Sequence, residues 1–228
     1  NKSSPVLVAN LVDVIEVASG GFHVCALLKD YSVKCWGNNT FGSVGDASNV
    51  QRILPVSVSN LSNVMHLTAG GYSTCASVLS GKAYCWGSNS SGELGNQTKV
   101  NSNTPTEVYG LSTVSVVSMG ETGSACANLT SGLIYCWGSN VNGQLGDLTR
   151  TSSSTPVSVR EITGALSVTV AQNFACSKNS LGEYKCWGSN ADGELGRGYS
   201  DVARVPVKSL GFRLTFVNAS VPSVSGLP

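Results

Sequence analysis

The sequence predicts an all-β protein built from four repeated blade-like sheets of about four antiparallel strands each. Two series of residues predict the repeat. Tryptophans recur 50, 51 and 50 residues apart, at Trp36, Trp86, Trp137 and Trp187. Prolines keep nearly the same period, at Pro5, Pro55, Pro105, Pro156 and Pro206. A fixed period of this length indicates that one supersecondary unit is copied along the chain.

The proline series divides the chain into four units and part of a fifth. The units cover residues 5–54, 55–104, 105–155 and 156–205, and the partial fifth covers residues 206–217. We expect residues 1–217 to form a single repeat domain and residues 218–228 to be a tail or linker. The chain begins at Asn1 without a methionine, so we expect either a removed targeting segment or an excised part of a longer protein.

Every unit has the composition of short strands separated by turns. It opens with Pro-Val-x-Val or a relative and continues with a β-branched run such as VMHLTAGG (64–71). A hairpin with two cysteines follows, and then Trp-Gly and a glycine-rich loop. Alternating β-branched and aromatic residues are typical of strands. About four strand-length segments per unit fit a propeller blade, and no segment has a helical period.

The eight cysteines form pairs that lie ten positions apart: Cys25/Cys35, Cys75/Cys85, Cys126/Cys136 and Cys176/Cys186. In the second unit, a hairpin folded about residues 79–81 pairs Val78 with Lys82 and places Cys75 opposite Cys85. Opposed residues on antiparallel strands have Cβ atoms about 4.5–5.5 Å apart, close to disulfide geometry. We therefore predict one disulfide per hairpin and an oxidising compartment, with free buried thiols or a metal site as the alternatives.

The hairpin turn needs a residue in the left-handed region at its third position, usually glycine. Gly81, Gly132 and Gly182 occupy that position, whereas Tyr31 occupies it in the first unit. We expect the Tyr31 turn to be strained or built differently.

The residues after each hairpin are interpreted as architectural. Each tryptophan directly follows a cysteine, and neighbours on a strand point to opposite faces. The indoles of Trp36, Trp86, Trp137 and Trp187 are therefore predicted to pack against an adjacent blade. Side chains of the recurring asparagines are predicted to close a turn, at Asn39, Asn89, Asn140 and Asn190. The position shared by Glu93, Gln144 and Glu194 is interpreted as a solvated loop.

The motif Trp-Gly-x-Asn-x-x-Gly-x-Leu-Gly, preceded by Gly-Gly-x-x-x-Cys, resembles the regulator of chromosome condensation repeat. The resemblance extends from Pro5 to about Val217. It implies a β-propeller with four-stranded blades, of which that family usually has seven. The cysteine pairs resemble the secreted, disulfide-containing branch rather than the nuclear exchange factor. Because this chain has four units, a four-bladed ring, an open arc and one segment of a longer array all remain open.

Composition and patterning exclude several functions. The chain is 41% hydrophobic and 12% charged with a net charge of +1, which indicates a folded core. It has no cluster of Lys and Arg for a nucleic-acid backbone and no apolar run near the roughly 20 residues that span a bilayer. No carboxylate pair, Ser-His-Asp order or metal constellation stands out. We therefore predict a non-enzymatic protein without catalytic residues, cofactor, metal, nucleic-acid partner or membrane insertion.

The predicted function is a structural module of an extracellular or cell-surface assembly. Candidate N-glycosylation sites are Asn38, Asn60, Asn96, Asn128 and Asn218, of which Asn60, Asn96 and Asn128 are expected in or beside loops. We expect copies to associate head to tail into rings or filaments, with residues 206–217 of one copy completing a neighbour's first blade, and the alternative is that these residues close the chain's own ring. The alternative is a recognition module, such as a receptor ectodomain or enzyme inhibitor, that binds a protein or glycan through blade loops. Loops rich in Ser, Thr and Asn, at 96–104 and 147–155, favour the structural module.

Overall fold

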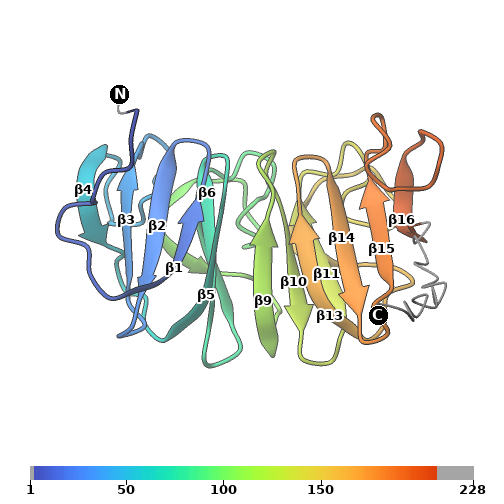
Figure 1. Cartoon of the computed structure of the whole chain (residues 1–228), viewed down its shortest axis with the longest axis horizontal. Helices are drawn as coiled ribbons and strands as arrows, with labels where there is room; N and C mark the ends of the chain where they lie inside the picture. Colours follow the sequence, from blue (N-terminus) through green and yellow to red (C-terminus); the bar gives the residue numbers. More distant parts are fainter. Residues whose placement is uncertain (1–2, 210–228) are drawn as a thin grey trace, which may run out of the picture.

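The computed structural model describes residues 3–209, which form four antiparallel sheets of four strands each (Figure 1). We call each sheet a blade. The first blade contains β1 (Val14–Ser19), β2 (His23–Leu28), β3 (Val33–Gly37) and β4 (Arg52–Ser57). The second contains β5 (Val64–Gly70), β6 (Ser73–Val78), β7 (Ala83–Gly87) and β8 (Ser102–Glu107). The third contains β9 (Val114–Met119), β10 (Ser124–Leu129), β11 (Ile134–Gly138) and β12 (Ser153–Ser158). The fourth contains β13 (Ala165–Val170), β14 (Phe174–Asn179), β15 (Tyr184–Gly188) and β16 (Ala203–Lys208). The predicted all-β class with four-stranded blades is confirmed.

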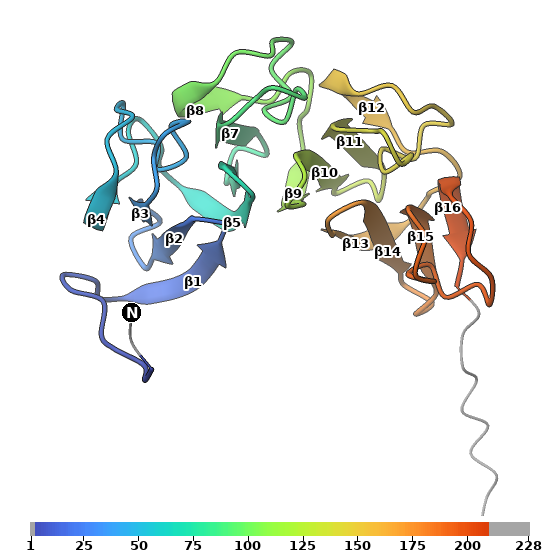
Figure 2. The same ribbon diagram turned by 90° about the horizontal axis from the view of Figure 1, so that it is seen from above.

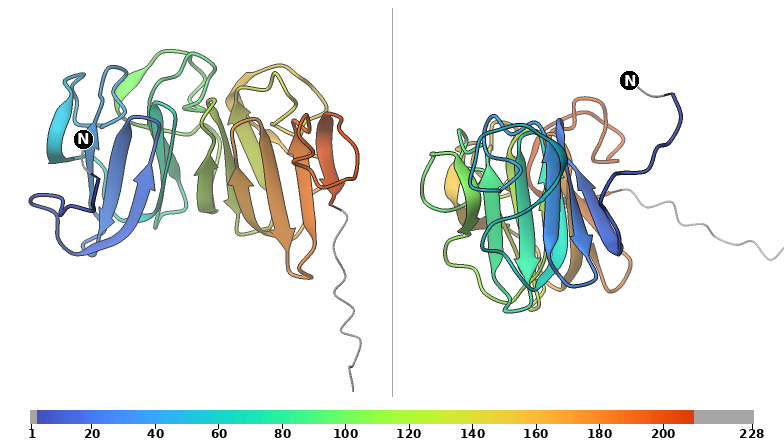
Figure 3. Two further views of the ribbon diagram at one scale, coloured as in Figure 1. Left: turned by 45° about the horizontal axis from the view of Figure 1, so that its top comes forward. Right: turned by 90° about the vertical axis from the view of Figure 1, so that its left-hand side faces the viewer.

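The strands of each blade follow one another in sequence order and pair with their chain neighbours. Figure 2 shows the blades side by side in an open arc, with β1, β5, β9 and β13 on the concave side and β4, β8, β12 and β16 on the convex side. The first and fourth blades lie at opposite ends of this arc. The loops gather at its two rims (Figure 3). Within the described residues, no helix has the length and hydropathy needed to cross a bilayer.

Glycines at the ends of the inner strands allow neighbouring blades to approach closely. A Cβ atom on Gly70 would lie 2.2 Å from the carbonyl oxygen of Gly120, and one on Gly120 would lie 2.1 Å from that of Ala171. Real Cβ atoms do not make contacts this short, so both positions require glycine in this arrangement. The fourth blade carries Ala171 at the corresponding position.

The hairpins have the predicted register and turns. Cys75 lies opposite Cys85, and the main-chain N of Val78 donates to Lys82 O at 3.0 Å. Gly81 has φ of 79° and donates to Val78 O at 2.9 Å. Tyr31 takes the same left-handed conformation with φ of 62°, which is unfavourable for a bulky side chain. The first hairpin therefore keeps the turn of the others and carries the strain that its sequence predicts.

The four predicted disulfides are confirmed, and none of the described cysteines is free. They join Cys25–Cys35, Cys75–Cys85, Cys126–Cys136 and Cys176–Cys186, with Cα atoms 4.0–4.1 Å apart. Each bridge closes a short loop, so each contributes somewhat under about 3 kcal/mol.

The sequence units and the blades are out of phase. Pro55, Pro105, Pro156 and Pro206 all lie within the outer, fourth strands of the blades. The Pro-Val-x-Val segment therefore ends a blade instead of opening one. Residues 206–208 belong to β16, where Val207 pairs with Cys186 and Lys208 with Lys185. The prediction that they complete the first blade of a neighbour is therefore wrong, and residues 210–217 lie outside the described residues.

Candidate protein-interaction surfaces

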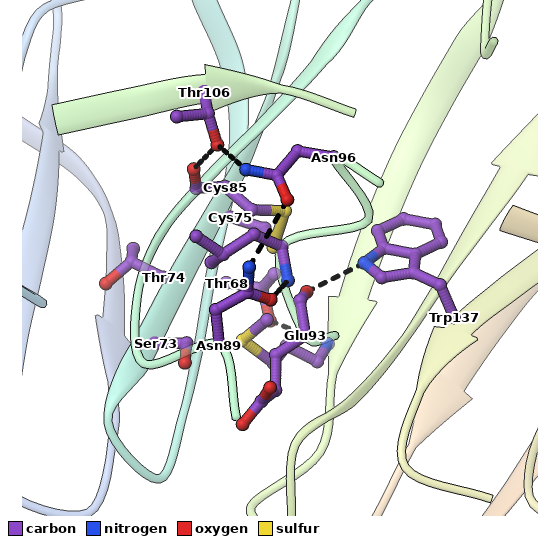
Figure 4. The surroundings of a disulfide bond; sticks show 12 residues. Thr68, Ser73, Thr74, Cys75, Cys85, Asn89, Glu93, Asn96, Thr106 and Trp137 are labelled. Atoms are coloured by element: carbon purple, nitrogen blue, oxygen red, sulfur yellow. Dashed lines mark hydrogen bonds between the residues drawn. A yellow bond between two sulfur atoms is a disulfide. The ribbon is translucent and has the colours of Figure 1, made fainter. Parts of the chain in front are cut away.

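Three tryptophans join successive blades. Trp137 is fully buried, and its Nε1 donates to the carbonyl oxygen of Glu93 in the preceding blade at 2.8 Å (Figure 4). It packs in one cluster with the preceding disulfide, Cys75–Cys85. The other two bonds are Trp86 to Ser43 O at 2.9 Å and Trp187 to Gln144 O at 2.8 Å. Each inter-blade contact thus joins the disulfide face of one blade to the indole face of the next.

A buried asparagine holds the loop that carries each accepting carbonyl. In the second blade, Asn89 Oδ1 accepts from the main-chain N of Leu94 at 2.9 Å, and its Nδ2 donates to Thr98 O and Val100 O at 3.1 and 3.0 Å. Asn39, Asn140 and Asn190 make the same 2.9 Å bond to the residue five places later. The asparagine therefore does more than close a turn, because it fixes the seat of the next tryptophan.

The position interpreted as a solvated loop is buried in the first three blades, so that interpretation is wrong there. Glu93 is 5% exposed, and Ser43 and Gln144 are also buried. Their main-chain oxygens accept the indole bonds described above. Glu194, the counterpart in the fourth blade, is half-buried, and no following indole is present among residues 3–209.

The first blade exposes residues whose counterparts are buried between blades. Val17 is 59% exposed, whereas its counterparts are buried at 5%, 4% and 5%: Leu67, Val117 and Val168. Val14 is also exposed, and Trp36 is half-buried, unlike the other three tryptophans. We call Val14, Val17 and Trp36 the first-blade face. It has the apolar residues of an inter-blade contact without a neighbouring blade among the described residues.

An apolar segment lies at the same end of the arc (Figure 2). Val6, Leu7 and Val8 are exposed, and Leu7 is 100% exposed. They repeat the Pro-Val-x-Val pattern of the outer strands, but they lie in none of the described strands. The segment adds apolar surface next to the first-blade face.

The outward side of the fourth blade is different. Cys176 is half-buried here, Lys178 occupies the position of Leu27, and Tyr184 that of Val33. Tyr184 is 52% exposed, and the Lys178 Nζ atom lies 6.0 Å from the centre of its ring. We call Cys176, Lys178 and Tyr184 the fourth-blade face. Its bulky and charged groups make it an imperfect copy of the inner disulfide faces.

A buried histidine lies between the first two blades. His23 Nε2 is 2.7 Å from Thr74 Oγ1, and its Nδ1 has no hydrogen-bond partner. Burial away from water lowers the pKa of His23 from 6.5 to about 4, because the charged imidazolium loses its hydration. His23 is therefore neutral near pH 7.

The candidate glycosylation sites differ in accessibility. Asn60 is exposed, and Asn38 and Asn96 are half-buried. Asn128 lies in β10 and is 3% exposed, so the expectation that it lies in or beside a loop is wrong and a glycan has no room there. Asn218 lies outside the described residues. Glycosylation at Asn38, Asn60 and Asn96 stays a prediction.

The described residues offer no evident site for a metal. Among residues 3–209, no group of three or more His, Cys, Asp or Glu is placed to hold a metal ion.

The repeated blades and their tryptophan seats define a β-propeller repeat protein. A sequence profile of the regulator of chromosome condensation (RCC1) repeat matches residues 32–77, 80–127 and 131–179. A second RCC1 repeat profile matches residues 14–43 and 66–93. The first profile covers more than half of the sequence, and the chain belongs to the RCC1 repeat family.

Solved structures share the fold at low sequence identity. Prp20p from Saccharomyces cerevisiae has a TM-score of 0.79 and 18% identity over 90% of this chain and 52% of its own. Human WBSCR16 has a TM-score of 0.75 and 21% identity over 86% of this chain and 51% of its own. Yeast RCC1 (Prp20) bound to Kap60 has a TM-score of 0.72 and 21% identity, over 86% and 48%. The chain thus spans about half the length of these proteins. The comparison with curated proteins gave no match.

Proposed function

We propose that the chain is a non-enzymatic protein-interaction module of an extracellular or cell-surface assembly, in which copies join head to tail by blade-to-blade pairing. The observation that supports this function is the first-blade face. Val17 is 59% exposed there, while the same position is buried in all three other blades. Exposed apolar surface of this kind favours association with another chain.

The inner contacts of the chain suggest how a second copy would dock. Trp36 of one copy would donate to the Glu194 carbonyl of the next, as the other indoles donate to Ser43, Glu93 and Gln144. The apolar floor of that seat would come from Leu195 and Cys186, which belong to one cluster. Such a heterologous contact extends into a ring or a filament, depending on whether the rotation closes.

The fourth-blade face would weaken this contact relative to the inner ones. The methyl group of Ala171 occupies a position where a Cβ atom meets the next backbone in the inner contacts. Lys178 would also lose hydration on docking without a matched carboxylate on the first-blade face. We therefore propose reversible association, weaker than the packing between blades of one chain.

The disulfides support an oxidising compartment, because bridges of this kind are rare in the cytosol and nucleus. N-linked glycans at Asn38, Asn60 and Asn96 are part of the same proposal. Yeast Prp20 was solved bound to Kap60, and Prp20p was studied for its binding to Gsp1p and histones. These partners support the proposal that this fold binds proteins. A shared fold does not by itself identify which protein this chain binds.

A second candidate function is recognition of a protein or glycan through blade loops. It is favoured by an aromatic cluster on one rim, formed by Phe22, Phe41 and Tyr72, of which Phe22 and Tyr72 are exposed. The two functions use different surfaces and are separable by mutation.

The experiment that tests head-to-tail association is sedimentation velocity over a wide concentration range. We expect the mean mass of the wild-type chain to rise with concentration and that of Val17→Asp to stay monomeric. Val141→Asp is the matched control, because Val141 is equally exposed in a loop of the third blade. A wild-type chain that stays monomeric at every concentration contradicts the head-to-tail proposal and leaves loop recognition.

A further inference from the structure

Three aromatic side chains meet on one rim of the first two blades. Phe22 stacks on Tyr72 with ring centres 5.1 Å apart and planes 19° apart. Phe41 meets Tyr72 edge-on at 5.1 Å. Phe22 is 61% exposed, and Tyr72 is also exposed. Phe41 is half-buried. None of the three belongs to the hydrophobic clusters between the blades, so their contacts lie outside the inter-blade core.

The repeat itself does not require these aromatic residues. The loop positions that hold Phe41 in the first blade hold Ser91, Asn142 and Asp192 in the others. The fourth blade has Asn173 at the position of Phe22 and Tyr72, and the third has the irregular segment 120–123. The aromatic cluster is therefore a local feature of the first two blades.

Tyr72 also lines a cavity between the loops of the second and third blades. This cavity has a volume of about 230 Å³ and a rim of glycines, including Gly71 and Gly120. Its charged lining residues among the described part of the chain are two carboxylates, Glu93 and Glu121, and no Lys or Arg lines it. Its volume is below the roughly 300–1,000 Å³ of small-molecule sites. The space fits one long side chain.

The two carboxylates differ in their surroundings. Glu93 is buried, and its Oε2 accepts from the main-chain N of Ser91 at 2.7 Å. Its Oε1 lies 3.4 Å from the Ser88 hydroxyl. Glu121 is exposed at the mouth of the cavity. Together with the aromatic residue Tyr72, which lines the same cavity, they make the site attractive to a cation.

We propose that this rim site, formed by Tyr72, Glu93 and Glu121 with Phe22 and Phe41 packed against Tyr72, binds an arginine side chain of a partner protein. A guanidinium group can stack on an aromatic ring while donating hydrogen bonds to a carboxylate. An aliphatic side chain would leave Glu121 without a charge partner, and an acidic one would be repelled. Phe22 and Phe41 belong to loops of the first blade, but none of the site's residues is part of the first-blade face or the fourth-blade face, so the site does not depend on head-to-tail association.

The test is an NMR titration of the isotope-labelled chain with the peptide acetyl-Gly-Gly-Arg-Gly-Gly-amide. A second peptide carries citrulline, which keeps the shape of arginine but has no charge. We expect the arginine peptide to shift the amide signals of Gly71, Gly120 and Gly123, and the citrulline peptide to have little effect. Binding should weaken at high salt, because Glu121 is exposed to solvent.

Two variants define the contacts. Tyr72→Leu should weaken arginine binding about two- to fivefold through loss of the cation–π contact. Glu121→Gln should weaken it to a similar extent. Because Glu121 is exposed, this change keeps the fold and remains informative if Tyr72→Leu does not fold. Asp192→Asn is the control, since it removes an exposed carboxylate from the loop between β15 and β16 of the fourth blade, outside the cavity. Equal shifts with both peptides, or unchanged affinity in Glu121→Gln, would overturn the proposal.

Discussion

The two ends of the arc carry the same repeat but different surfaces. The first-blade face keeps the apolar residues of an inter-blade contact, with Val17 exposed and Trp36 half-buried. The fourth-blade face carries Lys178 where the first blade has Leu27, and Tyr184 where the first blade has Val33. The first-blade face therefore keeps the residues that one side of an inter-blade contact needs. The fourth-blade face is an altered version of the other side of that contact.

The inner edge shows what a following blade imposes on the sequence. Gly70 and Gly120 have no room for a Cβ atom because the next blade's backbone lies against them. Ala171, at the corresponding position of the fourth blade, has no following blade among residues 3–209. Glycine is therefore required at this position only where a following blade lies as close as it does in the inner contacts. The tryptophan, in contrast, is present in the first blade although no blade precedes it among residues 3–209.

The largest expected difference is between an inner and an end tryptophan. Trp137→Ala should lower the free energy of unfolding by about 3–5 kcal/mol, because it empties a fully buried site and leaves the Glu93 carbonyl without its donor. Trp36→Ala should cost less than about 1.5 kcal/mol in the monomer. Urea unfolding followed by circular dichroism measures both. Equal losses would show that another part of the chain covers Trp36.

The stability of the chain should depend on pH through His23, which is buried between the first and second blades. Its pKa is about 4 in the folded chain and near 6.5 in the unfolded chain, so the unfolded chain binds more protons between these values. The contribution of neutral His23 to stability is therefore fully present above pH 6.5. The free energy of unfolding falls by up to about 3 kcal/mol as the pH drops toward 4. His23→Gln should remove this part of the pH dependence. His66→Gln, which replaces an exposed histidine of β5, should keep it. Urea unfolding at several pH values, with the three proteins compared at each, makes the measurement.

A smaller effect should distinguish Gly120 of the third blade from Ala171 of the fourth, which occupy the same position at the end of the inner strand. Gly120→Ala should destabilise the chain by about 1–3 kcal/mol, because the added methyl group meets the carbonyl of Ala171. Ala171→Gly should change stability by no more than about 1 kcal/mol. Thermal unfolding of the two variants checks the comparison. A tolerated Gly120→Ala would mean that the third and fourth blades are spaced more widely than described.

The smallest expected effect concerns the fourth-blade face. Tyr184→Ala combined with Ala171→Gly should tighten head-to-tail association a fewfold, because both changes make this face resemble the inner disulfide faces. Sedimentation velocity would detect the change, and Tyr109→Ala serves as an exposed aromatic control at an inner blade. Weaker association in the double variant would show that Tyr184 itself makes the contact.

The sequence predicted the features that depend on short spacings. The hairpin register and the disulfides followed from the ten-residue spacing of the cysteines, because antiparallel pairing of the two hairpin strands places these cysteines opposite each other. The sequence period did not show where each blade begins, because a period has no origin. The strand that contains Pro55, β4, pairs with β3 across a loop of 14 residues, 38–51. The polarity of Glu93 and Gln144 suggested solvent exposure, and only the fold shows that Asn89 and Asn140 hold these positions inside.

The rim site was missed for a related reason. Phe22 and Phe41 are separated by 19 positions, 41 minus 22, and only the second unit repeats an aromatic residue at either position, Tyr72 at that of Phe22. One signal was available. In an antiparallel meander, the loop between the first two strands and the loop between the last two lie on the same rim. Placing the aromatic residues on those loops would have indicated the cluster.

Hydrogen exchange of the four indole N–H groups, followed by NMR at low and high protein concentration, tests the central claim most directly. In the dilute monomer, we predict slow exchange for Trp86, Trp137 and Trp187, whose indoles donate to the preceding blade, and fast exchange for Trp36. Trp36 should become protected as the chain associates. Slow exchange of all four indoles in the dilute monomer, or an unprotected Trp36 in the associated protein, would contradict an open first-blade face that pairs with another copy.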